Sequence, residues 1–91
     1  MLFPKTVFVE ENTIEKQLEH IGTEFQEVVE EVYPQLRPGK NYDAIAGELW
    51  DLIQSAETAL RILDEQHGVE INLIRQGIFE KNRARNYYKE A

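Results

Sequence analysis

The chain has 91 residues, a formal net charge of −7 and no cysteine. A chain of this length forms at most one domain, and its core stays thin unless copies of it associate. The negative charge argues against a nucleic-acid polymer as the main partner. Without cysteine there are no disulfides and no thiolate zinc ligands, and no segment approaches the ~20 apolar residues of a membrane span. We therefore expect a cytoplasmic protein without a membrane partner.

The N-terminal residues predict an arm followed by a helix. Residues 1–11 contain TVFVEE after Pro4, which we interpret as an extended arm lying on the body or on a neighbour. Asn12 and Glu15 have the spacing of a capping box, which predicts a helix over about 13–33 that ends before Pro34. Residues spaced alternately by four and three give this helix one apolar core stripe. The stripe comprises Ile14, Leu18, Ile21, Phe25, Val28 and Val32.

A second helix is predicted over about 43–66, after the loop PQLRPGKNY. Asp43 is expected to cap it, and Gly68 to end it in the left-handed conformation. Gly47 marks either a tolerated weak first turn or a close approach of two helices. The expected core stripe is Ile45, Leu49, Leu52, Ala56, Leu60 and Leu63. The apolar residues outside it predict a second buried face, and hence a subunit interface; they are Trp50, Ile53 and Ile62.

A third helix is predicted over about 69–85, with Ile71, Ile74 and Ile78 on one face. The expected fold is therefore all-α: a single domain over 1–91, built as a small bundle of three main helices. We expect it to form a homodimer or a homotetramer through its helix faces.

Two pairs of acids flank the core stripes. Glu24 and Glu27 lie on one helix, and Glu48 and Asp51 lie on the next, with no Lys or Arg three or four residues away. If the helices pack as an antiparallel hairpin, the four carboxylates converge and repel one another. A hard divalent cation such as Mg²⁺ relieves this repulsion, because it prefers carboxylate oxygens. The alternative is that these acids are solvated helix faces.

Basic residues at the end of the third helix form a second candidate group. Lys81, Asn82 and Arg85 continue the face of Ile74 and Ile78. Such groups are suited to a polyanion held by the metal, since Lys offers a point charge and Arg a planar fork. The alternative is a favourable interaction of cations with the helix C-terminus.

These residues resemble the MazG-like all-α nucleoside triphosphate pyrophosphohydrolases, of the small phage and bacterial type. The matching segments are HIGTEFQEVVEEV, GELWDLI and IFEKNRARNYY, within about residues 13–88. The family pairs ExxE on one helix with ExxD on the next and ends in EKNxxRGYY. Four positions depart from the family pattern: His20 replaces a lysine, Thr23 a glutamate, Ser55 a tyrosine and Asn86 a glycine.

The resemblance implies that the four acids Glu24, Glu27, Glu48 and Asp51 bind Mg²⁺, for which Mn²⁺ can substitute. It also implies phosphate contacts from Lys81, Asn82, Arg85 and either Tyr87 or Tyr88. The implied reaction cleaves a nucleoside triphosphate between its α and β phosphates, giving a monophosphate and pyrophosphate. Members form dimers or tetramers with sites at subunit interfaces.

The expected mechanism is metal-assisted hydrolysis, in which Mg²⁺ activates a water and neutralises phosphate charge. Either Glu24 or Glu27 accepts the proton of that water. His20 is either a substrate contact or a half-exposed polar residue. Trp50, Tyr42, Phe25 and Tyr33 are the aromatic candidates for stacking on the base, although Trp50 favours interface packing and Phe25 the core.

Two other functions are compatible with the sequence. One is a non-catalytic acidic helical oligomer that acts as a protein-interaction or regulatory module and needs no metal. The other is a phosphoribosyl-ATP pyrophosphatase, which belongs to the same broad superfamily as the MazG-like enzymes.

Overall fold

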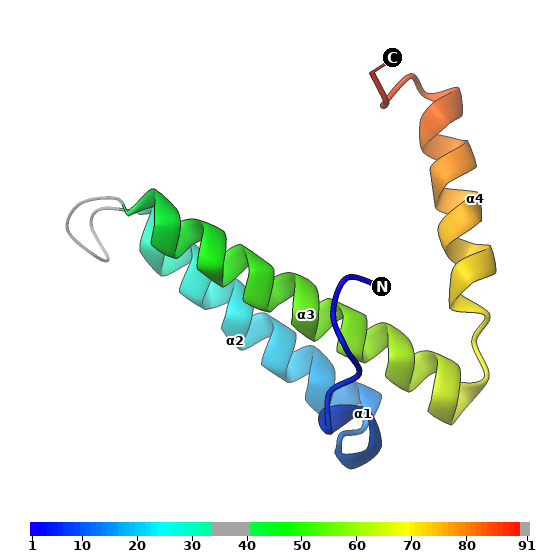
Figure 1. Cartoon of the computed structure of the whole chain (residues 1–91), viewed down its shortest axis with the longest axis horizontal. Helices are drawn as coiled ribbons and strands as arrows, with labels where there is room; N and C mark the ends of the chain where they lie inside the picture. Colours follow the sequence, from blue (N-terminus) through cyan, green and yellow to red (C-terminus); the bar gives the residue numbers. More distant parts are fainter. Residues whose placement is uncertain (34–40, 90–91) are drawn as a thin grey trace.

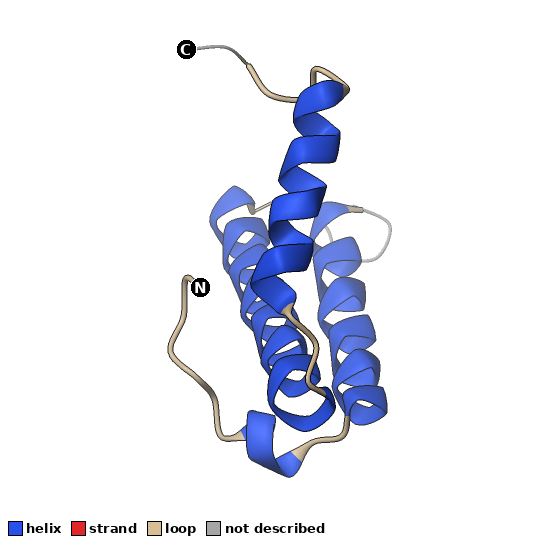
Figure 2. Cartoon of the chain, turned by 90° about the vertical axis from the view of Figure 1, so that its right-hand side faces the viewer, coloured by secondary structure: helices blue, strands red, loops and turns tan. Residues whose placement is uncertain are grey.

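The computed structural model describes residues 1–33 and 41–89, which form four helices and no strand (Figure 2). The helices are α1 (Phe8–Glu11), α2 (Ile14–Val32), α3 (Tyr42–His67) and α4 (Ile71–Ala84). The all-α class and the three long helices are confirmed. No helix in these two ranges is long and apolar enough to cross a membrane. The predicted loop segment 34–40 lies outside the described residues.

The helices form a wide part and a narrow part (Figure 1). α2 and α3 lie side by side and antiparallel, whereas α4 leaves the far end of α3 and projects away from both. The chain measures 43 × 41 × 20 Å, with a radius of gyration of 15.8 Å. A compact domain of this length has a radius of gyration of about 12 Å. In the single chain, therefore, α4 does not close a three-helix bundle.

The first predicted helix start is displaced by one residue. Thr13 caps α2, because its hydroxyl accepts a hydrogen bond of 3.1 Å from the backbone N–H of Lys16. Asn12, the predicted cap, instead ends α1, and its side chain donates to Gln17 Oε1 at 2.8 Å. Asn12 is buried, and its amide bonds to a Gln17 side chain that in turn reaches Ser55 on α3.

The second long helix begins one residue before the predicted range and is capped by a different residue. Asn41 Oδ1 accepts a hydrogen bond of 3.1 Å from the backbone N–H of Ala44, so Asn41 and not Asp43 is the N-cap. Asp43 lies in the first turn, where a negative charge is favourable. Gly68 ends α3 with φ 68°, as predicted. An added methyl group at Gly47 would meet no atom within 4 Å, which contradicts the close-approach alternative within the single chain.

The N-terminal arm was predicted to be extended to residue 11, which is wrong for Phe8–Glu11, a single helical turn. Before this turn the chain crosses α3, where the carboxylate of Glu57 accepts hydrogen bonds from the backbone N–H groups of Leu2 (2.7 Å) and Phe3 (2.9 Å). Partial burial acts to raise the pKa of Glu57, but these hydrogen bonds outweigh it and the pKa is lowered. Arg61, one turn along, donates to the carbonyl of Phe3 at 2.9 Å. The arm therefore lies on the body of its own chain.

The helices meet along a flank of the predicted apolar stripes and not along their centres. The stripe residues Leu18 and Phe25 are 55% and 57% exposed, whereas Gln17 is buried on α2. On α3, Ile62 was predicted to lie outside the core but is fully buried. The pattern of apolar residues is correct, but the side of each helix that meets its neighbour is rotated by about a quarter turn.

This rotation leaves an apolar surface uncovered on the antiparallel pair, and the projection of α4 leaves another on that helix. The exposed large apolar residues of the three long helices include Leu18, Phe25, Leu49, Ile53, Leu60, Leu73, Ile74 and Ile78. The chain exposes 7045 Å² of surface. A folded monomer of this mass exposes about 5500 Å². The excess of about 1500 Å² is larger than the ~800 Å² that one partner buries in a standard protein interface.

Candidate functional site

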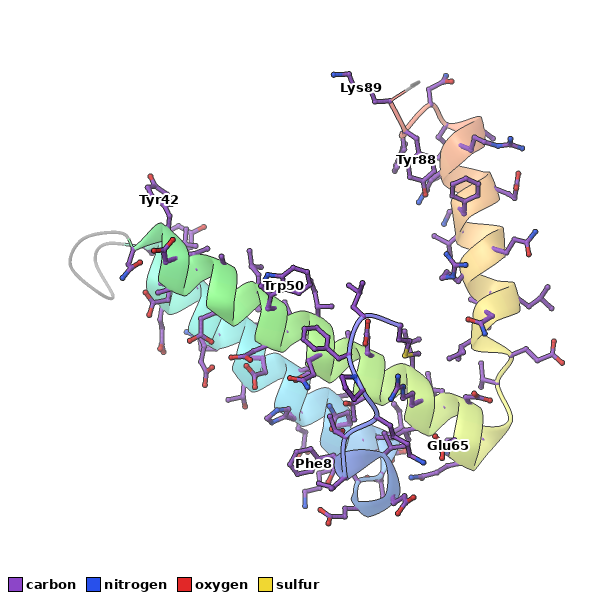
Figure 3. The ribbon with its side chains drawn as sticks, in the orientation of Figure 1. Phe8, Tyr42, Trp50, Glu65, Tyr88 and Lys89 are labelled. Atoms are coloured by element: carbon purple, nitrogen blue, oxygen red, sulfur yellow. The ribbon has the colours of Figure 1, made fainter. Side chains whose placement is uncertain are left out.

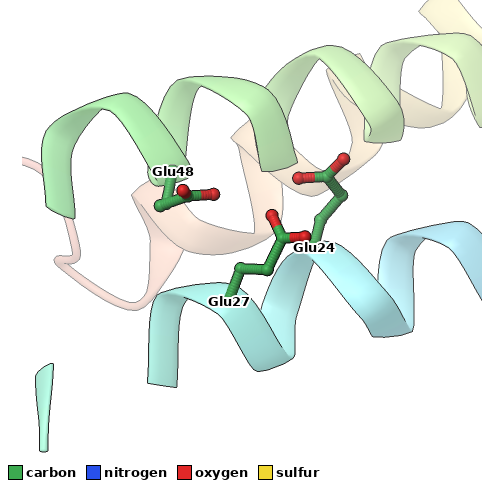
Figure 4. A group of neighbouring side chains, drawn as sticks. All are labelled: Glu24, Glu27 and Glu48. Atoms are coloured by element: carbon green, nitrogen blue, oxygen red, sulfur yellow. The ribbon is translucent and has the colours of Figure 1, made fainter. Parts of the chain in front are cut away.

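Three of the four predicted metal ligands converge between α2 and α3 (Figure 4). Glu24 and Glu27 extend from successive turns of α2, and Glu48 reaches toward them from α3. One carboxylate oxygen from each lies within 4.8 Å of the others. The spacing of three residues on α2 places both acids on the flank that faces α3. The antiparallel pairing then supplies the third acid, as the sequence predicts.

Asp51, the fourth predicted ligand, is exposed and lies at the edge of this group. Its charge is close enough to raise the pKa values of both Glu24 and Glu48. It also lines a cavity together with Glu24. We define the acidic cluster as Glu24, Glu27 and Glu48, with Asp51 beside it.

The acidic cluster is electrostatically strained. Oε2 of Glu24 and Oε2 of Glu48 are buried and have no hydrogen-bond partner among the described residues. Burial, followed by the charge of Glu27, raises the pKa of Glu24. Hydrogen bonding to Glu27, followed by burial, raises the pKa of Glu48. Buried oxygens of this kind are costly unless a proton or a cation compensates them.

His20 lies beside the cluster, one turn before Glu24 on α2. Its Nε2 is 3.1 Å from Glu24 Oε1, and its side chain is about half exposed. This contact uses Oε1 of Glu24, whereas Oε2 is the buried oxygen without a partner among the described residues. The structure therefore places His20 where it can hold Glu24 in position and still face an incoming ligand.

A cavity of about 170 Å³ adjoins the acidic cluster and shares Glu24 and Asp51 with it. Phe8 contributes the aromatic wall, with its ring centroid 6.5 Å from that of His20. The remaining lining side chains are polar: Thr6, Gln17, Gln54, Ser55 and Thr58. Sequence analysis did not select Phe8 or Gln54: the packing of the N-terminal arm brings Phe8 to the acids, whereas Gln54 lies three residues after Asp51 on α3.

Hydrogen bonds hold the inner wall of this cavity rigid. Gln17 accepts from Asn12 and donates through Nε2 to the carbonyl oxygen of Ser55 at 3.0 Å, so both ends of its amide are used. The hydroxyl groups of Thr6 and Thr58 are 3.0 Å apart and share a hydrogen bond. Gln54 is half-buried, and its side chain forms no hydrogen bond with the described residues. Its amide is therefore free to bond to a ligand in the cavity.

The aromatic residues considered for base stacking lie elsewhere (Figure 3). Trp50 is on the side of α3 away from Phe8 and packs edge-on against Phe3, with centroids 5.8 Å apart. Tyr42 is at the opposite end of the helical pair from Phe8. Phe25, predicted to be core, is exposed, as is Tyr33.

The predicted phosphate-binding residues are not brought to the acidic cluster within one chain. Lys81, Asn82 and Arg85 lie at the end of α4, and Tyr87 follows it. This helix projects away from α2 and α3. Asn86 has φ 61°, in the left-handed region that glycine adopts most easily. Asn is among the non-glycine residues that tolerate this conformation best.

No protein-family model, curated protein or solved structure matches this chain. The geometry of the acidic cluster and of the adjoining cavity therefore carries the functional argument.

Proposed function

We propose that the protein is a Mg²⁺-dependent nucleoside triphosphate pyrophosphohydrolase of the MazG-like type. The observation that carries this proposal is the convergence of three carboxylates from two helices, two of them with a buried, unpartnered oxygen. A fold that needs no ligand has no reason to keep such oxygens beside one another, because two apolar residues there would cost less. Mg²⁺ and nucleoside triphosphates are abundant in the cytoplasm, where we place the protein.

The residues that would hold Mg²⁺ are Glu24, Glu27 and Glu48, with Asp51 at the open side. When bound, the ion lowers the pKa of a water and neutralises charge on the phosphates, and Mn²⁺ can serve in its place. Either Glu24 or Glu27 would accept the proton of the water that attacks the α-phosphorus. His20 restrains Glu24 through its 3.1 Å contact.

We further propose that a second copy of the chain completes the site. Large apolar residues are exposed on all three long helices, and α4 is separated from the acids of its own chain. The α4 of a neighbouring copy would supply Lys81, Asn82, Arg85 and Tyr87 to the phosphates. This arrangement corresponds to a homodimer or a homotetramer.

Pyrophosphate release tests the activity directly. We would assay the full chain with canonical and oxidised deoxynucleotides and with phosphoribosyl-ATP, in Mg²⁺ and in Mn²⁺. We expect release from at least one nucleoside triphosphate and a loss of at least about 100-fold in Glu48→Gln, because one ligand oxygen becomes a neutral amide. Glu19→Gln, an equal charge change on the exposed side of α2, is the matched control and should retain activity.

The uncovered apolar surface also favours the alternative, a non-catalytic interaction module. This alternative predicts no pyrophosphate from any nucleotide and no change in melting temperature with ~5 mM Mg²⁺. If both results are obtained while Glu48→Gln is more stable than the wild type, the metal site is wrong and the interaction module replaces it.

A further inference from the structure

We infer that the cavity between Phe8 and Gln54 binds the base of the substrate and that it selects a single-ring pyrimidine over a two-ring purine. The inference rests on the proposed function, because the base would enter the cavity only while the acidic cluster holds the phosphates of the same nucleotide. It adds a base-binding site and a substrate class to that function.

The position of the cavity fits a nucleotide that spans two neighbouring sites. Glu24 and Asp51 belong both to the acidic cluster region and to the cavity wall. A ligand that places its phosphates at the carboxylates therefore extends its remaining part into this space. Two further cavities between described residues are lined by the N-terminal arm with α3 or α4, and neither includes a residue of the acidic cluster.

The volume of the cavity is close to that of a space that accepts one ring. It measures about 170 Å³. An engineered protein cavity of about 150 Å³ is known to accept one benzene ring. A pyrimidine has the same six-membered frame, whereas a purine carries an additional fused ring. Because Gln17 is held at both ends by hydrogen bonds, the inner wall cannot retreat without breaking them.

The chemistry of the lining fits a base in particular. Phe8 is 47% exposed, so part of its ring is free for stacking. The amide of Gln54 offers a donor and an acceptor without a partner in the described chain, and rotation of the amide exchanges them. Cytosine presents an amino donor next to a ring acceptor, and uracil and thymine present the reverse order. Gln54 can therefore pair with either type of pyrimidine.

The test measures binding separately from hydrolysis. We would titrate the full-length protein with dCMP, dTMP, dAMP and dGMP in Mg²⁺ by calorimetry, and measure kcat/KM for the corresponding triphosphates. We expect the pyrimidine nucleotides to be favoured by at least about 10-fold in both measurements. Phe8→Ala should weaken pyrimidine binding by about 10-fold, which is the scale of one base–aromatic stack. Gln54→Leu keeps the shape of the side chain and should weaken it by a similar factor.

Tyr42→Ala is the matched control, since it removes an exposed aromatic residue of α3 away from the cavity and should leave binding unchanged. Circular dichroism establishes that each variant is folded, and Gln54→Leu keeps the test valid if Phe8→Ala unfolds. Equal binding of purines and pyrimidines, no binding of any nucleotide, or unchanged binding in both cavity variants would overturn the inference. Pyrimidine binding without pyrophosphate release would instead overturn the proposed reaction and leave the base site standing.

Discussion

The contact between α2 and α3 has two polar regions that differ in one respect. At the end near α1, the buried side chain of Gln17 links Asn12 to Ser55 and every amide group is used. At the acidic cluster, buried oxygens of Glu24 and Glu48 have no partner among the described residues. The same two helices thus build one polar contact that is complete and one that is not. The first stabilises the fold, and the second is where we propose that a ligand binds.

The largest expected effect concerns the response to metal. Wild-type protein should gain about 2.7 kcal/mol of unfolding free energy when Mg²⁺ is present at 100 times its dissociation constant. Glu24→Gln should lose most of this gain, because the neutral amide at position 24 no longer carries the negative charge that attracts the ion. Thermal melting with Mg²⁺ and with a chelator measures the difference, and an equal Mg²⁺ response in both proteins would contradict the metal site.

A substitution in the complete contact should act on stability instead. Gln17→Ala removes two buried hydrogen bonds and leaves the buried amide of Asn12 without its Gln17 partner, whereas the carbonyl of Ser55 stays within α3. We expect a loss of about 2 kcal/mol of unfolding free energy, with no change in the Mg²⁺ response per folded molecule. Urea denaturation measures this loss. Gln26→Ala, an exposed glutamine on the same helix, should change stability by less than about 0.5 kcal/mol.

Association should depend on the apolar surface. Leu18→Glu places a charge on the exposed apolar face of α2 and should raise the dissociation constant between copies by at least about 10-fold, while the fold is retained because Leu18 is exposed. Sedimentation equilibrium measures the change. Val7→Glu, an equally exposed position on the arm, is the control. A wild-type chain that is monomeric at high concentration would contradict the proposed interface.

Stability should depend on pH in opposite ways for the acidic cluster and for Glu57, which binds the N-terminal arm. The folded-state pKa values of Glu24 and Glu48 are raised above the ordinary value of 4.5, so the folded state keeps protons that the unfolded state releases. Without metal, this part of the stability is complete below pH 4.5 and is lost as the pH rises through the raised pKa values. Glu57 has a lowered pKa and acts in the opposite direction, since its contribution is lost as the pH falls. Urea denaturation of wild type and Glu24→Gln between about pH 4 and 8 isolates the Glu24 part, and the variant should show the weaker decline toward high pH.

The smallest expected effect concerns the stability of α3 beside the acidic cluster, and the substitution leaves the charges of the cluster unchanged. Gly47→Ala should raise the unfolding free energy by about 0.5 to 1 kcal/mol, because the added methyl group meets no atom and alanine favours the helix. Urea denaturation measures the gain. A loss of stability that appears only at concentrations where the chain associates would indicate that Gly47 lies at a contact between copies.

The sequence by itself determined the local elements and most of the acidic cluster. Helix positions follow from a period of 3.6 residues, and the left-handed Gly68 follows from the absence of a side chain. The convergence of Glu24, Glu27 and Glu48 followed from spacing within one helix and from one assumption, antiparallel pairing. Such features depend on neighbours within a few positions along the chain.

Only the tertiary structure decided which side of each helix is buried and what adjoins the acids. Periodicity defines a stripe but not the rotation of one helix against another, so Leu18 is exposed and Ile62 is buried. The same holds for Phe8 and Gln54, which meet at the cavity although 46 positions separate them in the sequence. Contacts of this kind depend on the packing of the whole arm against α2 and α3, which no local pattern encodes.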